Sequence, residues 1–311
     1  MQKLFSGIKP TGTLHLGNYF GAMRQFVDLA PRYDCTFMVA DYHSINSTRD
    51  PQELRSGIID IAAAFIAIGI NPAQSVIFKQ SDVPEHTELT WIFNSLVSVS
   101  FLMQAHAYKD AVANGKEANM GLFDYPMLMA SDILLYDTDI VPVGKDQQQH
   151  VEYAREAAAK FNNAFGETFK EPKEHILETV AVVPGTDGRK MSKSYGNTIP
   201  LFGTKDEIAK AVMSIITDSK AESPENVYAI HSLFRSKDDL AIIYTENKGK
   251  YKALKEALIE DIEALVAPMR EVRNAITDDD VKNILKEGGE RARAIASKKM
   301  ADVRTKLGVT I

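Results

Sequence analysis

The feature that most constrains the fold is a short, almost entirely apolar segment at residues 35–40 (CTFMVA). Central strands of a parallel sheet are covered by helices on both faces, so they are apolar throughout instead of alternating with polar residues. Comparable segments occur at residues 3–8, 75–79 and 139–143, and segments with helical apolar spacing separate them. This alternation predicts an α/β fold with a doubly wound parallel sheet.

Helices are expected on both sides of these strands. Residues 17–27 acquire helical apolar spacing directly after a turn. Asp50-Pro51 has the residue types of an N-cap and a first helical position, and it opens a helix that runs to about Gly69. Two more helices are expected at residues 86–108, as one segment, and at residues 122–136.

The last third of the chain is predicted to be all-α. Thr204 and Glu207 have the spacing of a capping box, which begins a helix over residues 204–216. A long helix follows, with a kink expected near a proline, and then one or two helices that are broken near a glycine pair. These features lie at residues 254–272, Pro268, residues 281–307 and Gly288-Gly289.

The change from alternating to all-α sequence suggests two domains. We predict a catalytic domain at residues 1–187 and a helical domain, with the loop that precedes it, at residues 188–287. The C-terminal helix at residues 288–311 is a candidate addition to the first domain.

Composition and charge narrow the functional classes. The 311 residues are 45% hydrophobic and 25% charged, as in ordinary globular proteins. The net charge of −6 disfavours a protein coated in nucleic acid but allows a local basic face. The end of the chain offers such a face, which fits either RNA phosphate or simple solvation of an exposed helix. Its basic residues are Arg291, Arg293, Lys298, Lys299, Arg304 and Lys306.

Cysteine content and hydropathy predict a cytoplasmic protein with no membrane contact. Cys35 is the single cysteine, so neither a disulfide framework nor a cysteine-based metal site can form within one chain. The most apolar segment, residues 58–70, contains Asp60 and is too short to cross a bilayer. The N-terminus enters folded-looking sequence directly, and we expect no signal peptide.

The most functional-looking segment is the loop at residues 188–197 (GRKMSKSYGN). Lys190 and Lys193 are interleaved with serine hydroxyls, and glycines lie on both sides of the pair. Lysine carries a compact point charge that suits phosphate oxygens. A loop of this composition either is a solvated surface loop or closes two ammonium groups onto a polyphosphate, and the unbroken order Lys-Met-Ser-Lys-Ser favours the second interpretation.

A second candidate site lies where the first strand leads into the first helix. His15, Gly17 and Asn18 are at this strand–turn–helix junction. Helix N-termini present free N–H groups and the positive end of the helix dipole to anions. Gly17 removes a side chain where a flat ring could lie against the backbone. The alternative is a surface histidine beside a helix cap.

Polar residues also follow the other expected strands. His43 comes directly after residues 35–40, at the end of a strand where ligands of open α/β sheets gather. In the helix at residues 122–136, Tyr125, Met129 and Asp132 share one face. A carboxylate on such a stripe needs a donor from the backbone or from a ligand.

Residues 139–143 lead through Gly144 into Asp146, which can cap the next helix. A strand, a glycine turn and a helix start again mark a crevice with polar side chains directed into it. This is the third junction of its kind in the chain.

These residues together resemble the class I aminoacyl-tRNA synthetases. The resemblance rests on His15-Leu16-Gly17-Asn18 at the first helix and on the Lys-Met-Ser-Lys-Ser (KMSKS) loop that precedes an all-helical region. The central segments are similar to the tryptophanyl-tRNA synthetases in particular, and the resemblance covers essentially the whole chain. These segments are residues 5–7, 17–22, 125–134 (YPMLMASDIL), 139–150 (DIVPVGKDQQQH) and 217–219.

The resemblance implies a Rossmann-like catalytic domain, a helical anticodon-binding domain and a homodimer. It also implies a two-step reaction: tryptophan and ATP form tryptophanyl-adenylate and pyrophosphate, and the tryptophanyl group then passes to tRNA(Trp). Mg²⁺ would accompany the ATP phosphates, and no metal would be bound by the protein alone.

The family motifs imply roles for individual residues. Lys190, Lys193, His15 and Asn18 would act on the phosphates during catalysis. The residues implied for ATP are Lys9, Thr11, Gly17, Asn18, Gly144, Asp146, Lys190, Met191, Lys193 and Ser194, with Asp146 on the ribose and Met191 on the adenine. The residues implied for tryptophan are Phe5, His43, Tyr125, Met129, Asp132, Val143 and Gln147, with Asp132 accepting the indole N–H.

Two departures from the sequence pattern of the family affect the details of substrate recognition. Many family members carry Gln where Lys9 stands, and residues 102–109 (LMQAHAYK) differ from the usual Arg-Met-x-Gln pattern. The alternatives are a tyrosyl-tRNA synthetase, which commonly has Gln at the position of Met129, a nucleotidyltransferase of the same superfamily, and an inactive tRNA-binding paralogue. A P-loop kinase or a nicotinamide enzyme is disfavoured, since neither glycine motif follows a strand.

Overall fold

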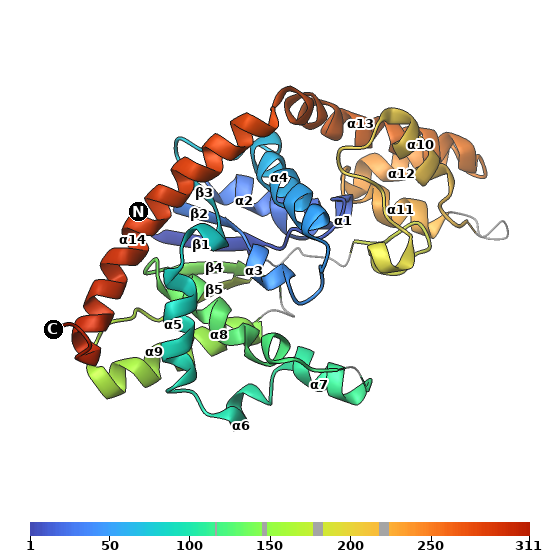
Figure 1. The fold of residues 1–311 in the computed structure, drawn as a ribbon. Coiled ribbons are helices and arrows are strands. Elements are labelled where there is room, and N and C mark those ends of the chain that lie inside the picture. The colour runs from blue at the N-terminus through green and yellow to red at the C-terminus, as the bar shows by residue number, and fades with distance from the viewer. Residues whose placement is uncertain (116, 145–147, 177–182, 218–223) are drawn as a thin grey trace.

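The computed structural model describes residues 1–115, 117–144, 148–176, 183–217 and 224–311. Within them, five parallel strands form one sheet in the order β3-β2-β1-β4-β5 (Figure 1). The strands are β1 (Lys3–Ile8), β2 (Asp34–Val39), β3 (Val76–Lys79), β4 (Ile140–Val143) and β5 (Lys173–Ile176). The predicted doubly wound, Rossmann-like sheet is confirmed, and the strand order reverses between β1 and β4.

Helices cover both faces of the sheet and continue into the last third of the chain. A π-helical turn at Tyr19–Met23 joins the first two helices, and short 3₁₀ turns occur at Gln80–Asp82 and Lys193–Tyr195. The described α-helices are α1 (Leu16–Asn18), α2 (Arg24–Leu29), α3 (Asp41–Ser44), α4 (Pro51–Ala67), α5 (Glu85–Asn94), α6 (Val99–Leu102), α7 (His106–Ala113), α8 (Met120–Leu134), α9 (Gln148–Phe165), α10 (Lys205–Met213), α11 (Glu225–His231), α12 (Lys237–Glu246), α13 (Tyr251–Ala275) and α14 (Asp278–Leu307).

Neighbouring residues of the central strands belong to different hydrophobic cores. Leu4 and Phe37 pack in one core with apolar side chains of α2, α4, α10, α11 and α13. Phe5 and Met38, the next residues along β1 and β2, pack in a second core with α5, α8 and α9. The alternation of side chains along a strand thus explains why both strands have apolar residues at consecutive positions, such as Leu4-Phe5 and Phe37-Met38.

The sequence missed β5, and the reason is its place in the sheet. Its sequence, Lys-Glu-His-Ile, contains one apolar residue, and it pairs only with β4 at the end of the strand order. Lys173 is exposed and Glu174 and His175 are half-buried, so β5 does not need the continuous apolar sequence of a strand that is covered on both faces.

The helix predicted at residues 86–108 is wrong as a single element. The structure has three helices there, α5, α6 and α7, because the backbone becomes extended at Ser98 (ψ 146°) and has ψ 129° at Ala105. Apolar residues occur on all sides of this segment, so the periodicity did not reveal the breaks. Ser98, a residue type favoured at N-caps, was the available signal.

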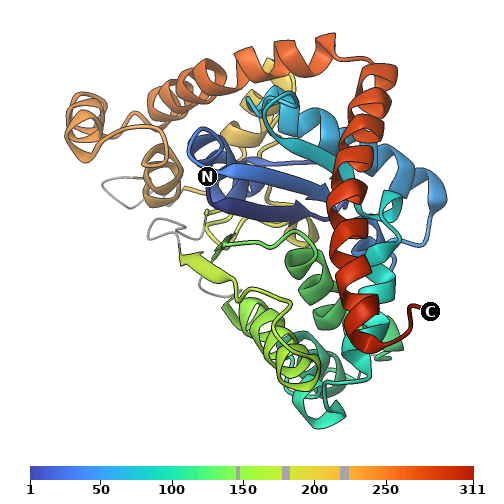
Figure 2. The ribbon, with the colours of Figure 1, turned by 90° about the vertical axis from the view of Figure 1, so that its left-hand side faces the viewer.

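The break predicted at Gly288-Gly289 is also wrong, because α14 continues through both glycines. A Cβ at Gly288 would overlap the carbonyl oxygen of Ile77, so the glycine is required by close packing of the helix on β3. Figures 1 and 2 show α14 (red) running along one edge of the molecule beside the sheet. A glycine pair in a helix can therefore signal close contact instead of termination.

Several basic residues of α14 attach it to the region that contains the sheet. Arg293 pairs with Glu85, and Arg304 pairs with Glu88, both on α5. Lys299 pairs with Asp137, and Arg291 donates to the carbonyl oxygens of Pro72 and Ser75. These cations thus have partners within the chain, and the structure gives no support to an RNA-binding role for this face.

The helices α10 to α13 form the remaining region, at the right of Figure 1. The capping box predicted at Thr204 and Glu207 is present at the start of α10. Pro268 lies inside α13, which is described as one continuous helix. The boundary between two domains at residue 187 stays a prediction. No described helix is both long and apolar enough to span a bilayer.

Candidate functional site

A cavity of about 1170 Å³ opens at the carboxyl ends of the strands. Its walls come from the end of β1, from α1, α3 and α8, from the end of β4, and from the loop at residues 190–194. This is the point where the strand order reverses between β1 and β4. Side chains from elements far apart in sequence converge there because parallel strands end at the same edge.

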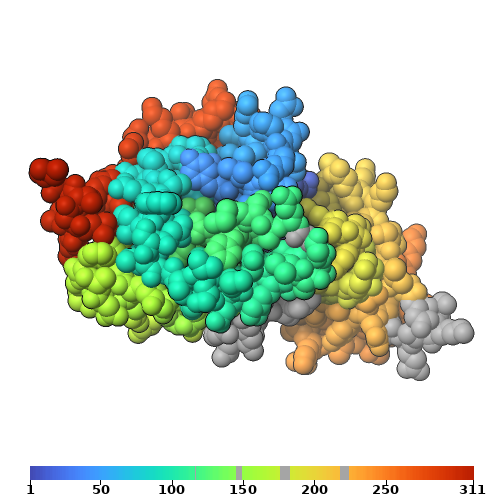
Figure 3. Space-filling model, turned by 60° about the horizontal axis from the view of Figure 1, so that its bottom comes forward, coloured from blue at the N-terminus to red at the C-terminus, as the bar shows by residue number. Residues whose placement is uncertain are grey.

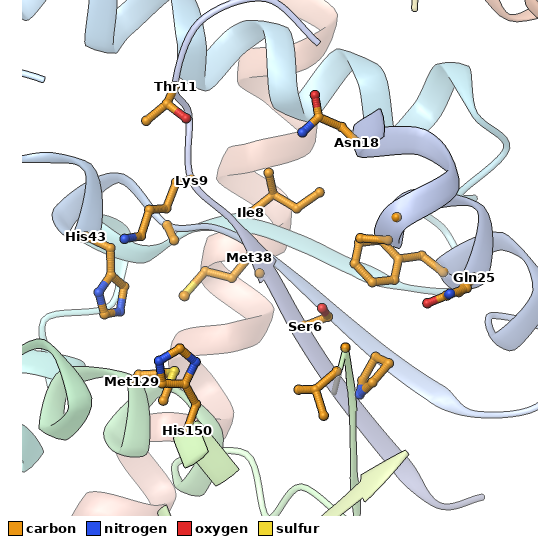
Figure 4. Close-up of a pocket in the computed structure, with 18 of the residues that line it drawn as sticks. Ser6, Ile8, Lys9, Thr11, Asn18, Gln25, Met38, His43, Met129 and His150 are labelled. Carbon is orange, nitrogen blue, oxygen red and sulfur yellow. The ribbon is translucent and has the colours of Figure 1, made fainter. Parts of the chain in front are cut away.

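Nearly all of the predicted site residues line this cavity. In Figure 4, Thr11 and Asn18 lie at the top of the view, Lys9 and His43 at the left, and Met129 at the bottom. The lining also includes Phe5, His15, Gly17, Tyr125, Asp132, Val143, Gly144, Lys190, Met191, Lys193 and Ser194. Asp146 and Gln147, together with Lys145, Asp218 and Ser219, lie outside the described residues.

His15 occupies the N-cap of α1 and is almost fully buried, with 6% of its surface exposed. Its backbone N–H donates to Asn18 Oδ1 at 3.0 Å, whereas its ring Nδ1 has no hydrogen-bond partner among the described residues. Burial, and then the positive charge of Lys193, lower the pKa of His15 from 6.5 to about 4. The ring is therefore neutral near pH 7, and it holds a buried polar atom in need of a partner.

Gly17 is required by the packing of this junction. A Cβ at this position would lie 2.8 Å from His15 Nδ1. The Gly17 N–H donates to the Met191 sulfur at 3.2 Å, so the loop closes directly over the start of α1. Met191 is buried in the core, which fixes the middle of the loop while Lys190 and residues 193–196 stay exposed.

The loop itself is tied together by Asn197, which is 2% exposed. Its side-chain amide donates to Asp187 Oδ1 at 2.6 Å and to the Lys190 carbonyl oxygen at 3.2 Å. Its Oδ1 accepts the Ser192 N–H at 2.8 Å. Asn197 thus holds the backbone on both sides of Met191.

The two loop lysines differ in their surroundings. The Lys193 ammonium donates to the Thr11 carbonyl oxygen, and burial lowers its pKa. The Lys190 side chain is exposed, and no described residue pairs with its ammonium. The loop therefore brings two lysines to one end of the cavity. Burial also lowers the pKa of Lys9, which extends from the end of β1 toward the middle of the same cavity.

At the other end, Asp132 is a buried carboxylate that is 1% exposed. Its Oδ2 lies 2.8 Å from His43 Nε2, and its Oδ1 lies 2.8 Å from Gln80 Nε2 and 2.6 Å from His86 Nδ1. Burial opposes ionisation, but the contacts with His86 and His43 outweigh it and lower the pKa of Asp132 from 3.8 to about 2. The carboxylate is therefore ionised at neutral pH.

Aromatic and apolar residues surround this carboxylate. Phe5 stacks on Tyr136 with 5.4 Å between ring centroids, and the Tyr125 hydroxyl lies 3.0 Å from His150 Nε2. Lys9 Nζ lies 5.9 Å from the centre of the Tyr125 ring. This end of the cavity thus combines ring-sized apolar walls with one buried acceptor.

Sequence reasoning missed four polar residues of the site. Gln80 and His86 contact Asp132, His150 pairs with Tyr125, and Asn197 organises the loop. Gln80 could have been predicted, because it follows β3 directly and ligand-binding residues were expected at the carboxyl ends of strands. His86 and His150 carry no such signal, since each is a histidine within a helical pattern.

Comparisons with known proteins agree with this geometry. Residues 1–285 match the family model described as tRNA synthetases class I (W and Y). The tryptophan–tRNA ligase of Fusobacterium nucleatum is 44% identical over 320 residues, which cover 99% of this chain and 98% of the relative. The corresponding enzyme of Rhodopirellula baltica is 42% identical over 318 residues, with 99% of both chains covered.

Solved structures are similar over the same extent. The tryptophanyl-tRNA synthetase of Campylobacter jejuni, complexed with ADP and tryptophan, has a TM-score of 0.91 at 43% identity, with 99% of this chain and 100% of the other covered. The tryptophanyl-tRNA synthetase of Mycoplasma pneumoniae has a TM-score of 0.84 at 29% identity, with 99% and 98% covered. The likeness thus includes the sheet, the loop and the helical region.

Proposed function

The chain belongs to the class I tRNA synthetases for tryptophan and tyrosine, within the branch of tryptophan–tRNA ligases, and from this premise we propose how its cavity performs the reaction. The enzyme activates tryptophan with ATP and transfers the tryptophanyl group to tRNA(Trp). The observation that carries the proposal is the cavity itself, which has cationic groups at one end and a buried carboxylate among apolar walls at the other.

In the first step the tryptophan carboxylate attacks the α-phosphorus of ATP, and pyrophosphate leaves. The protein contributes mainly position and charge, because no covalent intermediate with the enzyme is needed. Lys193 and Lys190 bind the leaving phosphates, and His15 and Asn18 hold phosphate oxygens at the start of α1. The buried Nδ1 of His15, which has no described hydrogen-bond partner, supports this assignment. A hydrogen bond between Nδ1 and the ligand would satisfy this atom.

The nucleoside part of ATP lies between α1 and the loop in this proposal. Gly17 and Gly144 give it close access to the backbone, Met191 packs against the adenine, and Thr11 and Ser194 line the path of the phosphates. Asp146 is proposed for the ribose hydroxyls on the family motif alone. Lys9 adds a further positive charge near the α-phosphate end of the cavity.

Tryptophan occupies the end that contains Asp132. The ionised carboxylate accepts the indole N–H, and Met129 and Val143 contact the ring together with Phe5 and His43. Phenylalanine lacks this donor and leaves the buried carboxylate short of a partner, which can cost about 10⁴-fold in kcat/KM. Tyr125 and Gln147 are proposed for the ammonium and carboxylate of the substrate.

Mg²⁺ enters this proposal with ATP. No cluster of three or more His, Cys, Asp or Glu side chains within the described parts of the chain could hold a metal ion. The phosphate oxygens would supply the ligands, and Mg²⁺ would offset their charge together with Lys190 and Lys193.

We also propose a homodimer, with residues 188–287 as the tRNA-binding region and the cytoplasm as the location. Large apolar side chains are exposed on α5, on α6 and directly after α6, notably Trp91 (74%), Val99 (64%) and Met103 (47%). Figure 3 shows the face that α5–α8 form (teal and green), beside the helical region (yellow to orange). Exposed apolar residues of this size favour a protein interface. Sedimentation equilibrium with the native chain and with Trp91→Asp tests the dimer.

The decisive measurement is ATP–pyrophosphate exchange dependent on the amino acid. We expect exchange with tryptophan, followed by formation of tryptophanyl-tRNA when tRNA(Trp) is added. Exchange with tyrosine and none with tryptophan would make the enzyme a tyrosine–tRNA ligase, and exchange with neither would make it an inactive paralogue.

A further inference from the structure

A buried polar network lies behind the wall of the cavity that carries Asp132. Asp132 and His43 line the cavity, whereas Gln80 and His86, both 0% exposed, reach the carboxylate from the protein interior. The three groups around Asp132 come from different elements: His43 from α3, Gln80 from the turn after β3, and His86 from α5. Three separately anchored side chains thus converge on one carboxylate of α8.

The two oxygens of Asp132 are used differently. Oδ1 accepts from Gln80 Nε2 at 2.8 Å and lies 2.6 Å from His86 Nδ1, so two side chains from the interior crowd it. Oδ2 has one described partner, His43 Nε2 at 2.8 Å. Because a carboxylate oxygen accepts two hydrogen bonds, Oδ2 keeps one acceptor position for a ligand.

The proton positions follow from the partners. The Gln80 amide must present its NH₂ group to the carboxylate, since its oxygen would repel Oδ1. His86 Nε2 lies 2.8 Å from the Tyr136 hydroxyl. Burial, and then the negative charge of Asp132, raise the pKa of Tyr136 well above 10, so the phenol keeps its proton. His86 Nε2 then accepts from the Tyr136 hydroxyl, and its Nδ1 faces Asp132 Oδ1 at 2.6 Å.

Aromatic packing fixes the far end of this network. His86 stacks on Phe78 with 5.9 Å between ring centroids, and Tyr136 stacks on Phe5, which lines the cavity. The network therefore has little freedom to rearrange when a ligand enters. A carboxylate held by one partner could rotate about its terminal torsion, which is soft.

We propose that Gln80 and His86 are positioning residues for amino-acid specificity, which hold the Asp132 carboxylate in the one orientation that leaves Oδ2 free to accept the indole N–H. This inference rests on the proposed function, because it concerns the amino-acid end of the same site. Neither residue touches the substrate; both act through Asp132.

The test compares tryptophan with 3-benzothienylalanine, a near-isostere with sulfur in place of the indole N–H. Gln80→Met keeps the side-chain length and removes the donor, and His86→Phe keeps a ring against Phe78 but removes the nitrogen that faces Oδ1. For both variants we expect kcat/KM for tryptophan in pyrophosphate exchange to fall by about 10- to 100-fold, the cost of losing a hydrogen bond to a charged group. The kcat/KM for the sulfur analogue and the KM for ATP should change little.

The ratio of the two kcat/KM values separates positioning from structural damage. A variant that merely distorts the fold lowers both values together and leaves their ratio unchanged. In the Asp132→Asn background, Gln80→Met should have no further effect on the ratio, because the group through which it acts is gone.

A matched control exists in the helical region. His231 is 0% exposed and lies 2.8 Å from Asp261 Oδ2, so His231→Phe removes an equivalent buried His–Asp contact far along the chain. The ratio of its two kcat/KM values should equal that of the native enzyme. Circular dichroism verifies the fold, and His86→Phe provides the result if Gln80→Met does not fold.

Two failures can be told apart. If the native enzyme exchanges pyrophosphate with tryptophan but both variants keep the native ratio, this inference is overturned and the function stands. If the native enzyme shows no exchange with tryptophan, the proposed function fails first.

Discussion

The two ends of the cavity differ in how far the protein completes them by itself. At the amino-acid end, His43, Gln80 and His86 meet both oxygens of Asp132. At the phosphate end, His15 Nδ1 is buried without a described partner, and no described residue pairs with the Lys190 ammonium. One end holds its acceptor in place with three side chains, and the other presents a buried, unpartnered ring nitrogen from a residue that lines the cavity.

In the proposed function, this difference gives the two ends different roles in the reaction. A buried acceptor with fixed partners can reject a substrate that lacks the matching donor, so the amino-acid end serves selection. Cationic groups held near each other gain from an incoming polyphosphate, so the phosphate end serves rate. Substitutions at the two ends should therefore change different kinetic constants.

The largest expected effect is at the amino-acid end. Asp132→Asn removes the charge and one acceptor oxygen while it keeps the shape, so we expect kcat/KM for tryptophan to fall by about 10³- to 10⁴-fold. The KM for ATP should stay near its native value. Pyrophosphate exchange over a range of each substrate measures both constants, and a comparable rise in the KM for ATP would contradict the separation of the two ends.

The next effect is at the phosphate end. Lys193→Met removes the ammonium that reaches Thr11, and we expect kcat for adenylate formation to fall by about 10²- to 10³-fold. Tryptophan binding in the absence of ATP, measured by calorimetry, should not change. The control is Lys298→Met on α14, an exposed lysine whose loss should leave both quantities at native values.

A smaller effect is expected from the residue that ties the loop together. Asn197→Ala removes the contacts with Asp187 and with the backbone at Lys190 and Ser192, so the loop loses its fixed shape. We expect the KM for ATP to rise by about tenfold, with a smaller change in kcat.

Asn162→Ala is the matched control for Asn197→Ala. Asn162 also ties a loop by its side chain, accepting the N–H groups of Thr168 and Phe169 at 2.9 and 3.0 Å, but at the end of α9. It should leave the KM for ATP at its native value. Equal rises in the KM for ATP in the two variants would show that Asn197 has no special role.

The smallest effect concerns pH. The pKa of His15 is lowered to about 4, so the ring should stay neutral from pH 8 to pH 5 and take up a proton only near pH 4. Unfolded chains protonate this histidine near pH 6.5, so its contribution favours the folded state above that pH and declines as the pH falls toward 4.

NMR titration of ring-labelled histidine, assigned with His15→Gln, measures this pKa directly. A midpoint near 6.5 would mean that the ring is solvated and that the phosphate end is less closed than the structure indicates. Addition of a non-hydrolysable ATP analogue should raise the midpoint, because negative charge beside the ring favours its protonated form.

Much of the fold could be predicted because central parallel strands leave an unmistakable pattern. Residues 3–8 and 35–40 are apolar at almost every position, and the structure explains this by placing Leu4 and Phe5 in different cores. The edge strand β5 was not predicted because its environment does not require a continuous apolar sequence. Gly288 was misinterpreted because a glycine that ends a helix and one that permits close packing look alike in sequence.

The site could be predicted where a residue follows a strand or belongs to a motif. His15, His43 and the lysines of the loop met that condition, and the structure gathers them around one cavity. Gln80, His86 and Asn197 contact the site through side chains whose direction depends on packing. Gln80 and His86 lie 52 and 46 positions before Asp132 in the sequence, and no local pattern encodes contacts over such separations.

The sequence by itself determined the family, the parallel sheet and the presence of both a polyphosphate loop and a buried carboxylate, because each depends on residue type and short spacing. Only the tertiary structure decided that Asp132 is held by three partners while His15 Nδ1 is left without one. It also decided that the basic face of α14 packs on the catalytic region. Burial and partnership are properties of the folded chain, since they depend on which distant residues packing brings together.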